Sequence, residues 1–73
     1  MSQWFQNTRQ DFIAATLRQF GQIRRGDLTR QFDISAQQAS LDIAAFMFST
    51  PGIMEYDVRA KSYIFIEPNE ANP

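Results

Sequence analysis

The sequence predicts an α+β domain in which three helices are followed by a two-stranded β-hairpin. Apolar residues recur at helical spacing before position 50, and β-rich runs follow Pro51-Gly52. Two of the helical patterns are joined by residues 32–35, and a turn of this length between two helices indicates a helix-turn-helix. A hairpin directly after that unit is a wing, so the chain is predicted to be a winged helix-turn-helix. The 73 residues allow one domain, predicted over residues 1–67, with a polar tail at 68–73.

The first helix is predicted to begin at Thr8, with Asp11 in its first turn, or earlier, near Ser2. Its apolar residues recur at helical spacing as far as Phe20. Gly21 should end this helix, because glycine readily adopts the left-handed conformation found at helix C-termini. Residues 22–24 are then long enough only for a minimal strand.

The second helix is predicted to begin at Gly26-Asp27 and to run for about two turns. Leu28 and Phe32 are four residues apart and therefore lie on one face. Asp33-Ile34 should form the turn of the motif, with Ile34 directed inward.

The third helix is predicted to run from a cap at Ser35 to about Ser49 and to stop at Thr50-Pro51-Gly52. Gln38 follows Ser35 by three residues, which predicts a capping box. The Ser hydroxyl should accept from a backbone amide, and the Gln side chain should reach back to the cap. The face expected to pack on the first two helices consists of Ala36, Ala39, Ile43, Phe46 and Met47.

The hairpin is predicted from two runs rich in aromatic and β-branched residues, Ile53–Val58 and Ser62–Ile66. Arg59-Ala60-Lys61 would form the loop between them. This loop has neither Gly nor Asn, so its turn type does not follow from the sequence.

Composition excludes several classes of function. The sequence has no Cys and no His, which excludes disulfides, thiolate nucleophiles and the usual zinc sites, and no cofactor or metal is expected. Asp and Glu are scattered without a catalytic motif, so an enzyme is not expected. The apolar runs are far too short to span a membrane, and no signal peptide is visible. A cytoplasmic protein is therefore predicted.

The charge distribution bears on nucleic-acid binding. The net charge is −1 and the pI is about 5.1, which argues against indiscriminate binding to phosphates. Residues 1–34 nevertheless sum to +2 and residues 35–73 to −3. Of the acids in the second group, Glu67 borders the terminal tail and Glu70 lies in it, and neither need approach DNA.

The start of the third helix is the candidate DNA-reading element, because the leading residues of that helix meet base edges in a helix-turn-helix. A Gln side chain can pair with adenine, an apolar side chain can contact a thymine methyl, and Ser and Arg side chains can hold phosphates. The same residues are also compatible with an ordinary solvated surface in which Arg pairs with nearby Asp. The predicted DNA-binding residues are Arg25, Ser35, Ala36, Gln37, Gln38, Ser40, Leu41, Arg59 and Lys61.

A second face of the third helix is also apolar, since Leu41, Ala44, Ala45 and Phe48 lie opposite the predicted core. Either Phe48 packs under the hairpin and Leu41 is incidentally exposed, or this side contacts another protein together with Trp4.

Three segments together resemble a known family: Arg-Gly-Asp-Leu at 25–28, Phe-Asp-Ile-Ser at 32–35 and Gln-Ala-Ser-Leu-Asp-Ile at 38–43. They resemble the N-terminal winged helix of WYL-domain transcriptional regulators, especially those that control bacterial anti-phage defence operons. The resemblance covers roughly residues 12–68. It continues through Pro51-Gly52, Tyr56-Asp57, Lys61 and Tyr63.

The resemblance implies a homodimeric repressor that binds inverted repeats. It places Gln37, Gln38 and Ser40 in the groove and Arg59 and Lys61 on the wing. The ligand-sensing WYL domain is absent, so the chain is either an excised N-terminal piece or a standalone regulator. The function predicted is sequence-specific binding of double-stranded DNA in transcriptional repression. The alternative is a winged helix used for protein contact.

Two positions of the third helix carry further expectations. The family pattern usually has Arg or Lys where this chain has Leu41, which removes an expected DNA contact. Asp42 is the only charged residue of this helix, and we predict that it pairs with Arg25 or Arg30 and locks the two helices of the motif.

Overall fold

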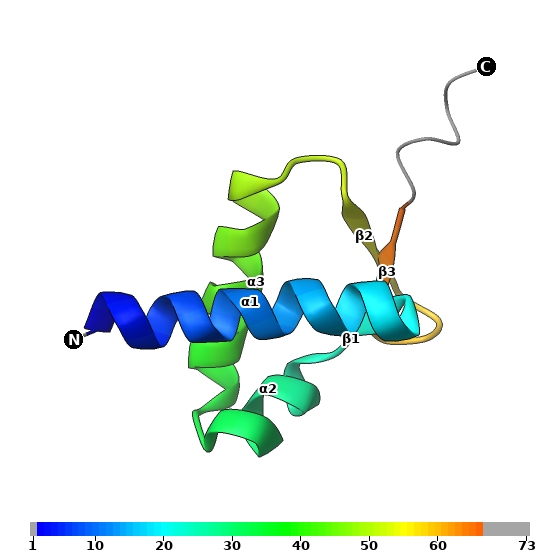
Figure 1. Cartoon of the computed structure of the whole chain (residues 1–73). Coiled ribbons are helices and arrows are strands. Elements are labelled where there is room, and N and C mark those ends of the chain that lie inside the picture. The colour runs from blue at the N-terminus through cyan, green and yellow to red at the C-terminus, as the bar shows by residue number, and fades with distance from the viewer. Residues whose placement is uncertain (1, 67–73) are drawn as a thin grey trace.

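A computed structural model describes residues 2–66, with side chains from residue 7 onward, and it confirms the predicted winged helix fold. The predicted tail at 68–73 lies outside the described residues. Figure 1 shows α1 crossing α3, with the strands at the C-terminal end of α1. The elements, in chain order, are α1 Ser2–Phe20, β1 Gln22–Ile23, α2 Arg25–Phe32, α3 Ala36–Ser49, β2 Met54–Asp57 and β3 Ser62–Phe65.

Helix α1 takes the earlier of its two predicted starts, near Ser2, and ends as predicted at Gly21. The backbone of Gly21 has φ +77°, and its amide donates to Leu17 O at 2.8 Å. No helix among residues 2–66 combines the length and apolar character needed to cross a bilayer.

The wing is part of a three-stranded antiparallel sheet with strand order β1-β3-β2. Gln22 of β1 lies opposite Ile64, and Ile23 lies opposite Tyr63. The Oγ of Ser62, which is fully buried, donates to Gln22 Oε1 at 3.0 Å. The predicted hairpin is therefore joined to the helices through the short strand between α1 and α2, and its orientation is set by that strand.

The turn of the motif forms where it was predicted. Asp33 adopts the left-handed conformation, with φ 55°, and its amide donates to Thr29 O at 2.9 Å. This reversal brings Ile34 back against the core, as expected. The aromatic rings of Phe12 and Phe32 meet edge to face at 5.4 Å and join α1 to α2.

The core lies where the three helices and the sheet meet. Burying each large aliphatic side chain there contributes about 1.5–3 kcal/mol to folding. The prediction for the packed face of α3 is correct for Ala39, Ile43, Phe46 and Met47, but it is wrong for Ala36, which is exposed in the first turn of the helix. The buried core residues are Ile13, Leu17, Ile23, Leu28, Ala39, Ile43, Phe46 and Met54.

Candidate nucleic-acid interface

The leading end of α3 is open to solvent, as the sequence predicted. Ser35 has extended backbone angles, φ −74° and ψ 160°, and its Oγ accepts from the Gln38 amide at 3.0 Å. This bond satisfies one of the backbone donors that the first turn of a helix leaves without partners. Ala36 and Gln37 are exposed, and the Leu41 side chain is 60% exposed.

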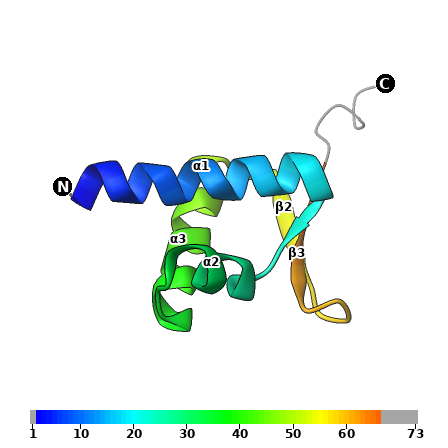
Figure 2. The ribbon, with the colours of Figure 1, turned by 60° about the horizontal axis from the view of Figure 1, so that its bottom comes forward.

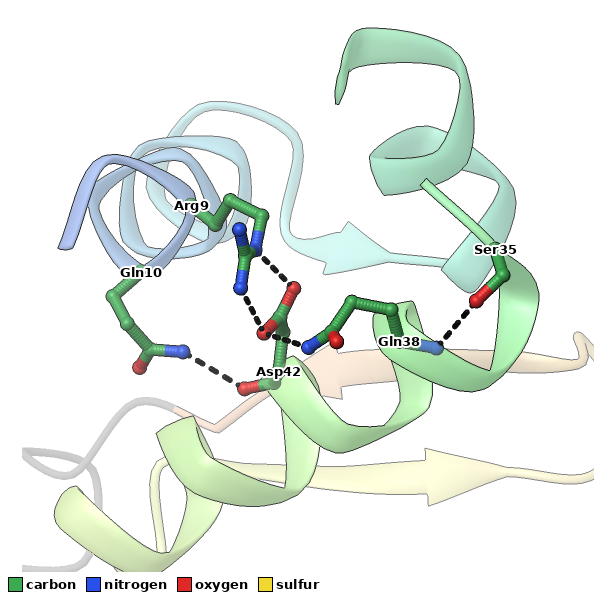
Figure 3. Close-up of polar contacts among 5 residues, drawn as sticks. All are labelled: Arg9, Gln10, Ser35, Gln38 and Asp42. Atoms are coloured by element: carbon green, nitrogen blue, oxygen red, sulfur yellow. Dashed lines mark hydrogen bonds and ion pairs between the residues drawn. The ribbon is translucent and has the colours of Figure 1, made fainter. Parts of the chain in front are cut away.

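The second half of the predicted capping box is wrong. The Gln38 side chain does not return to the cap but donates from Nε2 to Asp42 Oδ1 at 3.0 Å, one turn further along α3 (Figure 3). A buried carboxylate is a stronger acceptor than a solvated backbone group, so the side chain turns toward it. Gln38 is consequently half-buried, and Gln37 carries the free amide at this end of the helix.

The predicted partner of Asp42 is also wrong, because this carboxylate pairs with Arg9 of α1 rather than with Arg25 or Arg30. Arg9 Nε donates to Oδ2 at 2.5 Å and Nη2 donates to Oδ1 at 3.1 Å. The side chains are 10% and 2% exposed, so the pair is buried. Figure 3 shows that Gln10 adds a third link between α1 and α3, from its Nε2 to Asp42 O at 2.9 Å.

Sequence reasoning missed Arg9 although a signal was present. Arg9 precedes Ile13 by four residues, and Ile13 is fully buried, so both lie on the inner face of α1. A cation on a buried face needs an anion nearby. Of the two predicted starts, the one at Thr8 would place Arg9 in the first turn, away from the packed part of the helix, whereas the helix begins at Ser2.

The Arg residues near α2 have other roles. Arg30 Nη2 donates to Asp27 Oδ1 at 2.9 Å in an exposed ion pair, which bears out the expectation that Arg pairs with nearby Asp. Arg25 Nη1 lies 3.4 Å from Ser40 Oγ, so this exposed guanidinium is held beside α3. Within residues 7–66, Arg25 forms no ion pair. It is therefore a charge that remains available to a ligand.

The hairpin tip is ordered by the Asp57 side chain, for which no role in the turn was predicted. Asp57 Oδ1 accepts from the Arg59 amide at 2.9 Å and from the Ala60 amide at 3.2 Å, which is an Asx turn. Lys61 completes the loop with φ 54°. Arg59 and Lys61 are exposed, and Arg24 Nη2 donates to Ala60 O at 3.4 Å. The tip is thus tied to the start of α2.

Figure 2 shows that the start of α3 and the hairpin tip both extend away from α1, on the same side of the molecule. This side therefore presents an uncharged helix end flanked by Arg25 and by the two cations of the tip, Arg59 and Lys61. The arrangement has the shape and charge placement needed for a helix to enter a groove while side chains at its margins hold phosphates.

Three residues of the apolar second face of α3, Leu41, Ala44 and Phe48, are exposed, and Ala45 is half-buried. The expectation that Phe48 packs under the hairpin is wrong, because its side chain is 88% exposed. Trp4 lies outside the residues whose side chains the structure describes. The described residues hold no group of three or more His, Cys, Asp or Glu side chains that could ligate a metal ion.

Comparison with known proteins identifies the family of this chain. Residues 6–69 match the model of the BrxR transcriptional regulator winged helix-turn-helix domain. The chain is 45% identical over 62 residues to a DNA-binding transcriptional repressor CapW from Pseudomonas aeruginosa and 42% identical over 62 residues to one from Escherichia coli (strain KTE188). Each alignment covers 85% of this chain and 21% of the relative. The chain thus spans about a fifth of the length of the curated relatives it matches.

Proposed function

Because this chain belongs to the winged helix-turn-helix domain family of BrxR transcriptional regulators, we propose that it binds double-stranded DNA sequence-specifically and represses transcription. The resemblance to WYL-domain regulators seen in the sequence is confirmed at the level of this family. The observation that supports DNA binding best is the placement of the open end of α3 and the cationic tip on one side of the molecule (Figure 2). In this proposal α3 enters the major groove, and the hairpin contacts the flanking backbone.

Three cations are assigned to phosphates in this proposal: Arg25 beside α3, and Arg59 and Lys61 at the tip. Three phosphate contacts predict a slope of about −2.7 for the logarithm of the binding constant against the logarithm of salt concentration. Affinity of one domain should then fall about 40-fold between 50 and 200 mM salt. The fluorescence anisotropy of a labelled 20-base-pair random duplex, titrated with the chain across this salt range, measures the slope.

Two matched variants distinguish the loss of a phosphate contact from the loss of one positive charge anywhere on the surface. Arg59→Ala should reduce the magnitude of the slope by about 1 and weaken binding to all sequences alike. Arg18→Ala is the control, because it removes the same charge from an exposed position on α1 that lies beside Phe46 and Thr50, at the opposite end of α3 from the proposed interface. Equal effects of the two substitutions, or no binding to any duplex at 20 mM salt, would refute the proposed interface.

We further propose that two copies of the chain bind an inverted repeat as a homodimer in the cytoplasm. Two domains double the number of phosphate contacts, and a two-fold axis places the two α3 helices in successive major grooves about 34–36 Å apart. Sedimentation of the chain with duplexes carrying one or two half-sites tests this assembly. A single protomer on the two-site duplex at saturating protein concentration would contradict it.

Protein contact remains the second candidate, because Leu41 and Phe48 leave an apolar face uncovered at 60% and 88% exposure. Leu41→Arg distinguishes the candidates. It should tighten duplex binding if this face meets DNA, because it adds a cation next to phosphates and bases. It should instead disrupt protein assembly, with no gain in duplex binding, if the face is a protein contact.

A further inference from the structure

The outward side of α3 is a single row of residues, Gln37, Leu41, Ala44 and Phe48, which we term the outer stripe. These residues follow at intervals of four, three and four, so they lie one above another along the helix. All four are exposed, while Ala39 on the opposite side is fully buried. The outer stripe is therefore the surface that α3 would present to the floor of a groove.

The outer stripe carries no charge, and the fold leaves no charge beside it on α3. The only charged residue of the helix, Asp42, is buried against Arg9. The Gln38 amide is bound to the same carboxylate, so Gln37 is the one amide in the first turn that is free to bind a base. Guanine is most often read by Arg or Lys donating to its O6 and N7 atoms, and α3 offers neither residue.

We infer that the outer stripe selects A·T base pairs in the major groove, an inference that rests on the proposed DNA binding. The Gln37 side chain matches adenine, because its Nε2 can donate to N7 while its Oε1 accepts from the N6 amino group. Leu41 and Ala44 match the thymine methyl group, which is the only apolar group that the major groove displays. The cations that flank α3, Arg25, Arg59 and Lys61, bind phosphates and supply affinity without sequence preference.

The length of the stripe limits how many base pairs it reads. Gln37 and Ala44 are seven residues apart, which is about 10 Å along a helix. At a rise of about 3.4 Å per base pair, this distance covers about three steps of duplex. Each half-site should therefore contain a short core, two to four base pairs long, composed of A·T pairs.

Selection of bound duplexes from a random pool, followed by competition with modified bases, tests the inference. Replacing a selected A·T pair of the core by G·C should weaken binding about 5- to 150-fold. Replacing one core thymine by uracil removes only the methyl group and should weaken binding about fourfold. Replacing the core adenine by 7-deazaadenine removes N7 and should weaken binding of the unmodified chain but not of Gln37→Ala.

Variants assign these effects to the stripe. Leu41→Ala should lose the response to uracil, whereas Gln19→Ala, which removes an exposed amide on α1, should behave like the unmodified chain. Gln19, Gln37 and Leu41 are all exposed, so circular dichroism of the three variants should show an unchanged fold. A G·C core in the selected duplexes, or no response to uracil and 7-deazaadenine, would overturn the A·T inference while leaving duplex binding intact. Absence of binding to every duplex at 20 mM salt would overturn the DNA-binding proposal and this inference with it.

Discussion

The buried pair between Arg9 and Asp42 predicts a large and specific loss of stability when one partner is removed. Asp42→Ala removes the carboxylate that pairs with the buried Arg9 guanidinium, whose side chain is 10% exposed. It also removes the acceptor of the Gln38 side chain. Breaking a buried pair in this way costs about 3–5 kcal/mol, because the remaining charge loses the carboxylate that offset its removal from water.

This cost is large for a chain of this length. A domain of 73 residues has a free energy of unfolding of roughly 4–11 kcal/mol at 0.05–0.15 kcal/mol per residue. Each kcal/mol corresponds to about 4–8 °C in the melting temperature of a small domain. We therefore expect Asp42→Ala to lower the melting temperature by about 12–40 °C, and urea unfolding followed by circular dichroism at 222 nm measures the free energy directly.

Two further variants test whether the loss of stability comes from the uncompensated buried charge. Arg9→Met with Asp42→Leu replaces both charges by apolar groups and should restore most of the stability, since an apolar pair of similar volume avoids the desolvation of both ions. Arg30→Ala is the matched control, because it breaks an exposed pair in which the Arg30 side chain is 75% accessible, and should cost less than about 1 kcal/mol. A cost of Asp42→Ala no greater than that of Arg30→Ala, or a double variant as unstable as the single one, would show that burial of an uncompensated charge is not what destabilises Asp42→Ala.

Two other predictions concern local backbone structure. Ser35→Ala should cost about 1 kcal/mol, because it removes the hydroxyl that accepts from the first turn of α3, and thermal unfolding should show a shift of about 4–8 °C. Gly21→Ala should destabilise by about 1–2 kcal/mol through its φ of +77° alone, since no atom lies within 4 Å of the added Cβ. Gly26→Ala is its control: this glycine lies in helix α2, and the added Cβ meets only the flexible end of Arg30, so no loss of stability is expected.

Local chemistry explains why most of the fold could be predicted from the sequence. The end of α1 at Gly21, the turn at Asp33 and the cap at Ser35 each depend on a residue whose preferred conformation suits that position. The packed face of α3 follows from helical periodicity. Ala36 was the exception because it lies in the first turn of α3, which extends past the edge of the core into solvent.

Contacts between distant parts of the chain could not be predicted in the same way. Arg9 and Asp42 are separated by 33 positions, and pairing them requires knowing that α1 crosses α3 at this level. The prediction chose Arg25 and Arg30 because they are nearer in sequence and belong to the same motif. The Asx turn of Asp57 was accessible in principle, since an Asp side chain can form a turn by accepting from the backbone two residues further on.

The Arg9–Asp42 pair also resolves the apparent conflict between an acidic chain and a DNA-binding role. An exposed carboxylate on a helix that enters a DNA groove, as proposed for α3, would repel phosphates and raise the free energy of the complex. Here the carboxylate of α3 points into the core, where the Arg9 guanidinium cancels its charge. The net charge of −1 therefore misrepresents the surface that would meet DNA, because what DNA meets is set by the position of each charge. The same pair, together with the Gln10 bond and the core, holds α3 against α1 and so contributes to the orientation of the outer stripe.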